Sequence, residues 1–289
     1  MERVFRRAAL LLDGPGGDRQ GRGMDHNSTP TPNAATGRRR LYLMRHGHVD
    51  YFAAGLSDPR QVPLTGEGQS QARATATALA NVPFDFAVCS GLPRTRETAQ
   101  LVLAEQKASG ERVPALEEDL RFEELKSGWI KAGSREELAA RLAYCFDDAH
   151  DPNARFLPDG ESFGEAEARI VDGLTSMLTQ GAWKTGLLVA HEGVNRLILG
   201  WASGGGLATI GAFEQDLCAV NIIDFDITPA QTNSEARPRP AANGVQVERA
   251  ILKLVNVTAY DPVKEGLRKT CLEHLFDVDF GASRPPRAP

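Results

Sequence analysis

Short apolar runs that end in polar residues recur along the chain. Residues 41–44 are four apolar residues in a row that lead directly into Arg45 and His46. The apolar run 186–190 leads into His191 in the same way. Apolar runs of this length, bounded by glycine and polar residues, indicate buried strands. Similar runs predict further strands at residues 84–89, 113–116, 219–227 and 247–258.

Apolar residues recur at helical spacing in the segments between these runs. The segment 162–178 shows one apolar stripe, made of Phe163, Ala166, Ile170, Val171, Leu174 and Leu178. The same spacing predicts helices at residues 66–79, 94–102, 134–147, 194–202 and 264–276. Ser134 followed by Glu137 is the start of a capping box. Strands that alternate with helices predict an α/β fold, a three-layer α/β/α domain with a mostly parallel central sheet.

This alternating pattern extends over residues 39–280, which we expect to form one domain. A chain of 289 residues has room for one large α/β domain or two small ones. Residues 1–38 lack periodicity and are predicted to be a disordered N-terminal extension, and residues 281–289 a disordered tail. The proline-, serine- and asparagine-rich stretch 228–243 is expected to be a loop.

Charge and cysteine usage narrow the class of protein. The net charge of −5 leaves no general basic surface for nucleic acid. No apolar run approaches the roughly 18 residues of a membrane span. The four cysteines are far apart and form no C-x-x-C pair, which argues against a zinc knuckle and a disulfide framework. We therefore expect a cytoplasmic protein that binds neither nucleic acid nor membrane.

The polar residues at the strand ends are suited to chemistry on phosphorus. In open α/β sheets, ligands bind at the carboxyl ends of the strands, where Arg45, His46 and His191 are expected. An imidazole must be neutral to act as a nucleophile, and nearby arginines disfavour its protonated form. The same arginines can hold phosphoryl oxygens. We therefore expect His46 to attack phosphorus.

Several motifs support this expectation by their order and spacing. They are Arg45-His46-Gly47, Pro63-Leu64-Thr65, the stretch from Ser90 to Ala99, Gly160-Glu161-Ser162, and the stretch from Ala190 to Arg196. Together they resemble the histidine phosphatase superfamily, the phosphoglycerate mutase-like fold, over about residues 40–260. The resemblance implies a phosphomonoesterase that needs neither a metal nor a cofactor and acts on a small phosphorylated metabolite. In enzyme classes, this is a phosphoric monoester hydrolase of histidine acid phosphatase type.

The resemblance also assigns roles to residues. His46 would form a phosphohistidine, with its other ring nitrogen held by a backbone carbonyl. Arg45, Arg94 and His191 would surround the phosphoryl oxygens. His191 is predicted to be a catalytic residue as well as a phosphate-binding one. The spacing after Ser90 selects Arg94 over its neighbour Arg96.

The leaving alkoxide needs a proton, and so a general acid is required. Members of the superfamily place a glutamate a few residues before a glycine and an aromatic residue. Glu124, four residues before Gly128, fits this pattern better than Glu123. A solvated acidic face is the alternative explanation for this stretch.

Other functions are left open by the sequence. One alternative is a phosphoglycerate-type mutase, which would return the phosphoryl group to the substrate. Another is a non-catalytic module that has the same fold and binds a phosphorylated ligand without turning it over. Residues 160–164 also spell G-x-S-x-G, the nucleophile pattern of serine esterases, although the proline-containing segment before them is a poor strand. Metal sites are not expected, because the sequence His191-Glu192 continues to Asn195 where a metalloprotease motif needs histidine.

One departure from the superfamily pattern concerns the second histidine. Many members have glycine where Glu192 stands. Its carboxylate could raise the pKa of His191, or it could point away. The identity of the substrate is not predicted, and the oligomeric state is left open, with a dimer among the options.

Overall fold

A computed structural model describes residues 36–110, 112–127, 134–157, 159–230, 241–242 and 244–281. The predicted N-terminal extension, apart from its last three residues, lies outside these ranges, as does almost all of the C-terminal tail. Gly37 and Arg38, which were predicted to belong to the disordered extension, instead begin the first strand of the sheet. The rest of the division stays a prediction. None of the described helices is long and apolar enough to cross a membrane.

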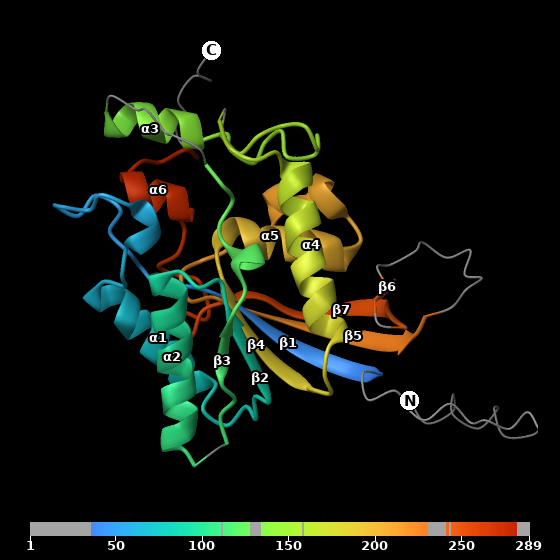
Figure 1. Ribbon diagram of the computed structural model, residues 1–289. Helices are drawn as coiled ribbons and strands as arrows, with labels where there is room; N and C mark the ends of the chain where they lie inside the picture. Colours follow the sequence, from blue (N-terminus) through green and yellow to red (C-terminus); the bar gives the residue numbers. More distant parts are fainter. Residues whose placement is uncertain are drawn as a thin grey trace, which may run out of the picture. The chain divides into compact units, whose positions relative to one another are not determined.

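A seven-stranded mixed sheet forms the centre of the described domain (Figure 1). Its strands are β1 (Gly37–Arg45), β2 (Phe86–Cys89), β3 (Leu116–Glu118), β4 (Thr185–Ala190), β5 (Val220–Pro229), β6 (Ala241–Ala242) and β7 (Val245–Val257), in the order β3-β2-β4-β1-β5-β7-β6. The pairs from β3 to β1 are parallel, and the pairs from β1 to β6 are antiparallel. The parallel half holds the strand ends on which the predicted chemistry depends.

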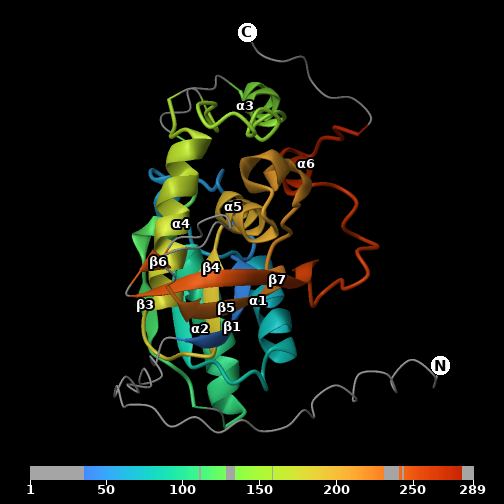
Figure 2. The ribbon, with the colours of Figure 1, turned by 90° about the vertical axis from the view of Figure 1, so that its right-hand side faces the viewer.

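Helices cover both faces of the sheet, which confirms the predicted three-layer architecture (Figures 1 and 2). The helices α1 (Gly66–Ala78) and α2 (Pro93–Ala108) pack on one face, and α4 (Phe163–Thr179) and α5 (Glu192–Ser203) pack on the other. Side chains of a strand alternate between the faces. In β1, Leu41 and Leu43 join the core under α4 and α5, whereas Tyr42 and Met44 join the core under α1 and α2.

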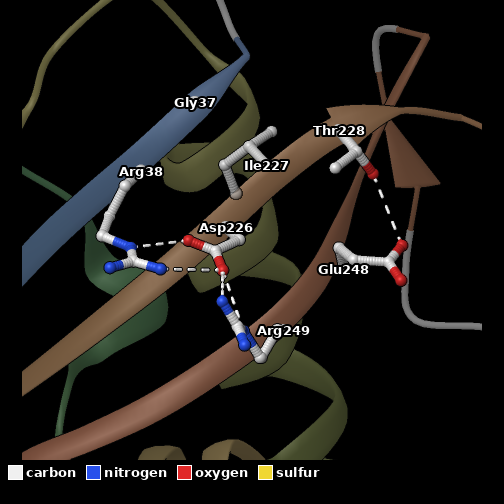
Figure 3. A pocket seen from close by; sticks show the side chains of 7 residues that line it. All are labelled: Gly37, Arg38, Asp226, Ile227, Thr228, Glu248 and Arg249. Atoms are coloured by element: carbon white, nitrogen blue, oxygen red, sulfur yellow. Dashed lines mark hydrogen bonds and ion pairs between the residues drawn. The ribbon is translucent and has the colours of Figure 1, made fainter. Parts of the chain in front are cut away.

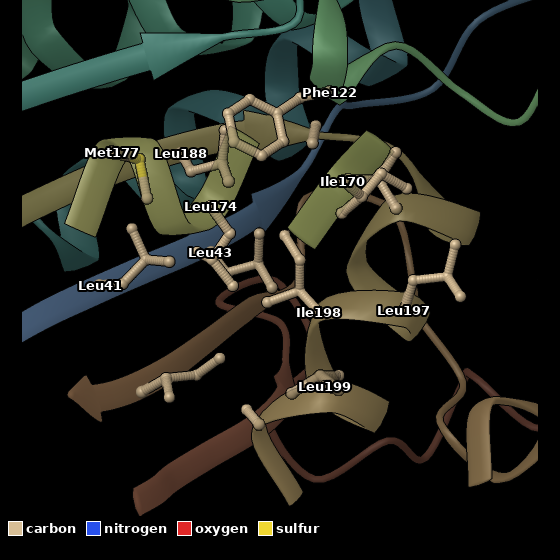
Figure 4. Close-up of a cluster of buried hydrophobic side chains, with 14 of the residues drawn as sticks. Leu41, Leu43, Phe122, Ile170, Leu174, Met177, Leu188, Leu197, Ile198 and Leu199 are labelled. Carbon is tan, nitrogen blue, oxygen red and sulfur yellow. The ribbon is translucent and has the colours of Figure 1, made fainter. Parts of the chain in front are cut away.

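Five members of the apolar stripe predicted from the sequence join the core under α4 and α5 (Figure 4), whereas the sixth, Val171, is only partly buried and lies outside this cluster. Ile170 and Leu174 of α4 are fully buried against Leu43 and Leu188 of the sheet. The helix begins where the sequence places it, because Ser162 accepts a hydrogen bond from the backbone N–H of Glu165 in a complete capping box.

Several elements differ from their predicted bounds, among them α2, which continues to Ala108 instead of ending at residue 102. β3 begins at Leu116 rather than at residue 113, because Pro114 has no N–H to donate to a strand ladder. The helix α3 (Arg135–Leu142) ends before residue 147, where the chain continues in turns of the i→i+3 type. The last helix, α6 (Cys271–Phe276), begins after residue 264, because Lys264 has a left-handed φ of 60° that a helix interior excludes.

Short 3₁₀ segments complete the chain, at η1 (Pro59–Gln61), η2 (Leu120–Phe122) and η3 (Gly206–Ala212). The loop from Asp50 to η1 lies beside α6 (Figure 1), where the rings of Phe52 and Phe276 meet with centroids 6.2 Å apart. This loop and α6 both lie at the carboxyl end of β1, so they border the predicted site.

Candidate active site

The carboxyl ends of β1, β2 and β4 bring His46, Ser90 and His191 together. Arg45 is in register with Ala190, and Cys89 is in register with Val189, so the residues that follow each strand emerge at one edge. The His46 and His191 rings lie with centroids 5.2 Å apart and planes at 65°. The two histidines therefore share one site.

The ring of His46 is oriented by its own backbone neighbour. Its Nδ1 lies 2.7 Å from the carbonyl oxygen of Gly47, the contact predicted for the second ring nitrogen. A carbonyl can only accept, so Nδ1 carries the proton and Nε2 of the neutral ring keeps its lone pair. Gly47 is needed for this turn, because a Cβ there would come 2.5 Å from the carbonyl oxygen of Gly68.

The electrostatic surroundings keep His46 neutral. Burial lowers the pKa of His46 well below its ordinary value, and the positive charges of Arg94 and Arg45 lower it further, against the opposing hydrogen bond to Gly47. A neutral imidazole with a lone pair on Nε2 is the form in which histidine is nucleophilic.

Two buried guanidinium groups flank this ring. Nη1 of Arg45 donates to the carbonyl of Gln215 at 2.5 Å and lies 3.1 Å from Oε2 of Glu192. Arg94 donates from Nη1 to the carbonyl of Pro59 at 3.4 Å, and its guanidinium carbon lies 5.8 Å from the centre of the Tyr51 ring. Arg96, the rejected neighbour, pairs instead with Glu118 at 2.6 Å.

His191 is held by a relay of hydroxyl groups. Thr95 donates its hydroxyl proton to the carbonyl of Leu92 at 2.9 Å, and its oxygen lies 2.9 Å from Ser90 Oγ. Ser90 then donates to Thr95 and accepts from Nε2 of His191, which lies 2.8 Å from Ser90 Oγ. In the neutral ring this leaves the lone pair on Nδ1, which is buried and has no partner among the described residues.

Glu192 does not raise the pKa of His191, so that alternative is wrong. Burial lowers the pKa of His191 well below its ordinary value, and Arg94, His46 and Arg45 lower it further. The Glu192 carboxylate points away from the ring and pairs with Arg45 and Arg196.

The structure separates the two candidate acids. Oε1 of Glu124 accepts hydrogen bonds from the backbone N–H groups of Leu125 at 3.0 Å and Gly193 at 3.1 Å. Glu123 instead pairs with Arg60 at 2.6 Å. Glu124 is therefore the glutamate that lies against the first turn of α5, just after His191. Gly128 and the aromatic Trp129 that marked this stretch lie outside the described residues.

Glu124 has the electrostatic environment of a proton donor. Burial raises its pKa, and the negative charge of Glu192 raises it further, against the opposing Leu125 N–H and the charges of Arg45 and Arg94. Because two N–H groups bind Oε1, the proton of the neutral acid belongs on Oε2.

Two residues of the site gave no signal in the sequence. Tyr51 stacks its ring near Arg94, and burial raises the pKa of its hydroxyl, which therefore stays protonated. Cys271, at the start of α6, lies near Arg45, and burial raises the pKa of its thiol to about 11. Tyr51 comes from a segment without periodicity and Cys271 from the predicted last helix, and only the fold brings them to the strand ends.

The serine of the G-x-S-x-G pattern has a structural role. Ser162 Oγ accepts the Glu165 N–H and so caps α4. In the described part of the segment before it, no strand of the sheet leads into Ser162, as a nucleophile elbow requires. Within the described ranges, no three His, Cys, Asp or Glu side chains are grouped so as to hold a metal ion.

A hollow of about 550 Å³ lies near the opposite end of β1 (Figure 3). Its charged groups pair with one another, since Arg38 and Arg249 both bind Asp226, at 2.7 Å and 2.6 Å. It contains neither of the two histidines and is not the candidate site.

Comparison with known proteins relates the chain to one family. The family model of the histidine phosphatase superfamily (branch 1) matches residues 41–233. The adenosylcobalamin/alpha-ribazole phosphatase of Salmonella typhimurium is 30% identical over 161 residues, which cover 55% of this chain and 77% of the relative. A probable phosphoglycerate mutase GpmB of Serratia proteamaculans is 31% identical over 157 residues, covering 53% of this chain and 69% of the relative.

A solved structure shares the fold. The crystal structure of a putative alpha-ribazole-5'-P phosphatase from Escherichia coli K-12 superposes with a TM-score of 0.56 at 24% identity, over 75% of this chain and 96% of the other. At this identity the likeness concerns the fold.

Proposed function

This chain belongs to the histidine phosphatase superfamily, and from this premise we propose that it is a phosphomonoesterase that forms a phosphohistidine on His46. We further infer that it is of histidine acid phosphatase type and that its substrate is a small phosphorylated metabolite. Its similarity to a relative named adenosylcobalamin/alpha-ribazole phosphatase supports this class.

One observation supports the proposal above all others. Seven buried side-chain polar atoms have no partner among the described residues, and three of them belong to the residues predicted to bind phosphate: Nε of Arg45, Nε of Arg94 and Nδ1 of His191. Buried polar atoms are nearly always paired, so unpaired ones need an explanation. A phosphoryl group beside His46 would accept from both guanidinium groups, and its negative charge would favour a protonated His191 that donates from Nδ1.

In the first half-reaction, Nε2 of His46 would attack phosphorus in line and the P–O bond to the leaving group would break. Arg45, Arg94 and His191 would balance the charge on the phosphoryl oxygens. Glu124 would give its proton to the leaving oxygen, so that an alcohol departs and the phosphoryl group stays on His46.

In the second half-reaction, the Glu124 carboxylate would take a proton from water. The water oxygen would bond to phosphorus as the N–P bond breaks, which restores neutral His46 and protonated Glu124 and yields inorganic phosphate. A mutase would use the same groups but give the phosphoryl group to an alcohol of the substrate. The similarity to a probable phosphoglycerate mutase supports this second candidate function.

We predict that hydrolysis of a generic aryl phosphate is unchanged by excess chelator, because two guanidinium groups can balance the charge that a metal would otherwise balance. Vanadate should inhibit, since its trigonal-bipyramidal form matches in-line attack. Release of inorganic phosphate measures turnover. Activity that vanishes with chelator and returns with magnesium or zinc would contradict metal independence, and absence of turnover on a panel of phosphate esters would favour a non-catalytic module.

Gly193 offers a test of how Glu124 is placed. A Cβ on Gly193 would come 2.8 Å from Oε1 of Glu124 and 2.3 Å from Cδ1 of Leu125, so alanine must displace the acid. We predict that Gly193→Ala lowers turnover of alkyl phosphates about 100-fold, the effect of misplacing a reacting group by about 1 Å. Gly66→Ala at the start of α1 is the control, because a Cβ there meets no atom within 4 Å. An equal loss of turnover in that variant would contradict the local explanation.

A further inference from the structure

Glu192 lies buried between two arginines at the start of α5. Its Oε2 is 3.1 Å from Nη1 of Arg45, and its Oε1 is 2.7 Å from Nη2 of Arg196. Arg196 in turn pairs with Glu214 at 2.6 Å. Burial alone would raise the pKa of Glu192, but Arg45 and Arg196 outweigh burial and lower it, so the carboxylate is ionised.

The contacts of Arg45 divide its guanidinium into two sides. Nη1 is occupied by Glu192 and by the carbonyl of Gln215. Nε, on the other side, has no partner among the described residues. The Gln215 carbonyl already holds Nη1 of Arg45. The main contribution of the Glu192 carboxylate is therefore a negative charge next to the Arg45 guanidinium that would bind phosphate.

We propose that Glu192 is a positioning residue of Arg45 that also weakens the hold of the site on anions, so that inorganic phosphate can leave after turnover. This inference rests on the proposed phosphatase function. A site that stabilises a phosphoryl group in flight with two buried guanidinium groups also binds the product anion. The carboxylate competes with that anion for Arg45, and so it reduces affinity for phosphate while Nε stays directed to the phosphoryl oxygens.

Other charges at the site do not replace Glu192 in this role. Glu124 accepts from two backbone N–H groups, and its pKa is raised, so it is not a fixed negative charge. Glu214 pairs with Arg196 and accepts from the backbone N–H of Cys271, and it forms no ion pair with Arg45 among the described residues. Among the described residues, Glu192 is the carboxylate that forms an ion pair with Arg45.

Glu192→Gln tests the inference, because glutamine keeps the size and removes the charge. We expect the dissociation constant of inorganic phosphate, measured by calorimetry without substrate, to fall about tenfold or more, since a unit charge at this range is removed from a poorly screened site. With an aryl phosphate, KM and kcat should both fall, because binding tightens and product release slows. Glu214→Gln is the matched control and should change phosphate affinity by less than about twofold.

A purely structural role predicts a different result. Loss of folded protein would lower kcat in proportion to the active fraction and leave KM and the phosphate dissociation constant unchanged, and this outcome would overturn the inference. So would weaker phosphate binding. If Glu192→Gln does not fold, Glu192→Gln with Arg196→Gln keeps the net charge of the buried cluster. Phosphate binding should still tighten, but less than in the single variant, because the positive charge of Arg196 is lost as well.

The phosphate titration also separates this inference from the proposed function. Tighter phosphate binding in a protein that hydrolyses no ester would support the role of Glu192 and overturn the phosphatase. If the wild type turns over substrate but Glu192→Gln leaves phosphate affinity unchanged, the result would support the phosphatase function and overturn the role of Glu192.

Discussion

Replacing His46 with alanine should abolish turnover, by at least about 10⁴-fold, while the protein still binds inorganic phosphate. A nucleophile has no substitute in its reaction, and its loss removes nearly the whole contribution of the groups that act with it. Phosphate affinity should stay within a few-fold of the wild type, because Arg45, Arg94 and His191 remain. Initial rates and a phosphate titration measure the two effects.

His48→Ala is the matched control. His48 lies two residues after His46, and its Nδ1 lies 2.9 Å from the hydroxyl oxygen of Thr65. It takes no part in the proposed chemistry. The alanine variant should keep most of its turnover.

The covalent intermediate gives a direct test of the same role. Enzyme quenched during turnover of labelled substrate should carry the label on the peptide that contains His46, in a form that is labile in acid and stable in alkali, as a phosphoramidate is. A label on another peptide would contradict the proposal. Loss of activity in Ser162→Ala, with His46→Ala still active, would favour the serine esterase instead.

Much of the fold follows from local sequence. The alternation of apolar runs and helical stripes predicted the three layers, because a strand or helix must bury its apolar side against another element. The antiparallel pairing of β5, β7 and β6 was not predicted, since strand direction is set by contacts between distant segments. The bounds of β3 and α6 depended on single residues, Pro114 and Lys264, that remove a donor or break helical geometry.

The site was predictable where its residues are fixed to a strand end. His191 directly follows an apolar run and His46 follows another after Arg45, so their meeting at one edge follows from a parallel sheet. Tyr51 and Cys271 reach the site from a loop and a late helix, and no pattern in their own segments places them there. The direction of the Glu192 side chain could not be predicted either, because it depends on Arg196 one helical turn later and on Arg45 at the end of β1.

The choice between Glu123 and Glu124 shows the same limit. Adjacent residues in an irregular stretch point in different directions, and the sequence alone does not say which one turns inward. The structure places Glu124 on the N–H groups of Leu125 and Gly193 and leaves Glu123 to Arg60. This placement supports Glu124 as the general acid of the proposed mechanism.

Glu124→Gln should lower turnover of alkyl phosphates by about 10²- to 10⁴-fold, the usual contribution of a general acid. Aryl phosphates should lose much less, because their leaving groups are stable without a proton. Initial rates on a matched pair of alkyl and aryl esters measure the difference. Glu123→Gln is the control, and a larger loss there, or equal losses on both esters for Glu124→Gln, would assign the proton to another group.

The pH profile should change with the same substitution. Because burial and Glu192 raise the pKa of Glu124, the acid stays protonated to a higher pH than an ordinary glutamate and loses its proton as the pH rises further. Turnover of alkyl phosphates by the wild type should therefore decline on the alkaline side through this raised pKa. Glutamine cannot lose a proton in this range, so the alkaline decline should disappear in Glu124→Gln, and a decline that persists unchanged would show that another residue donates the proton.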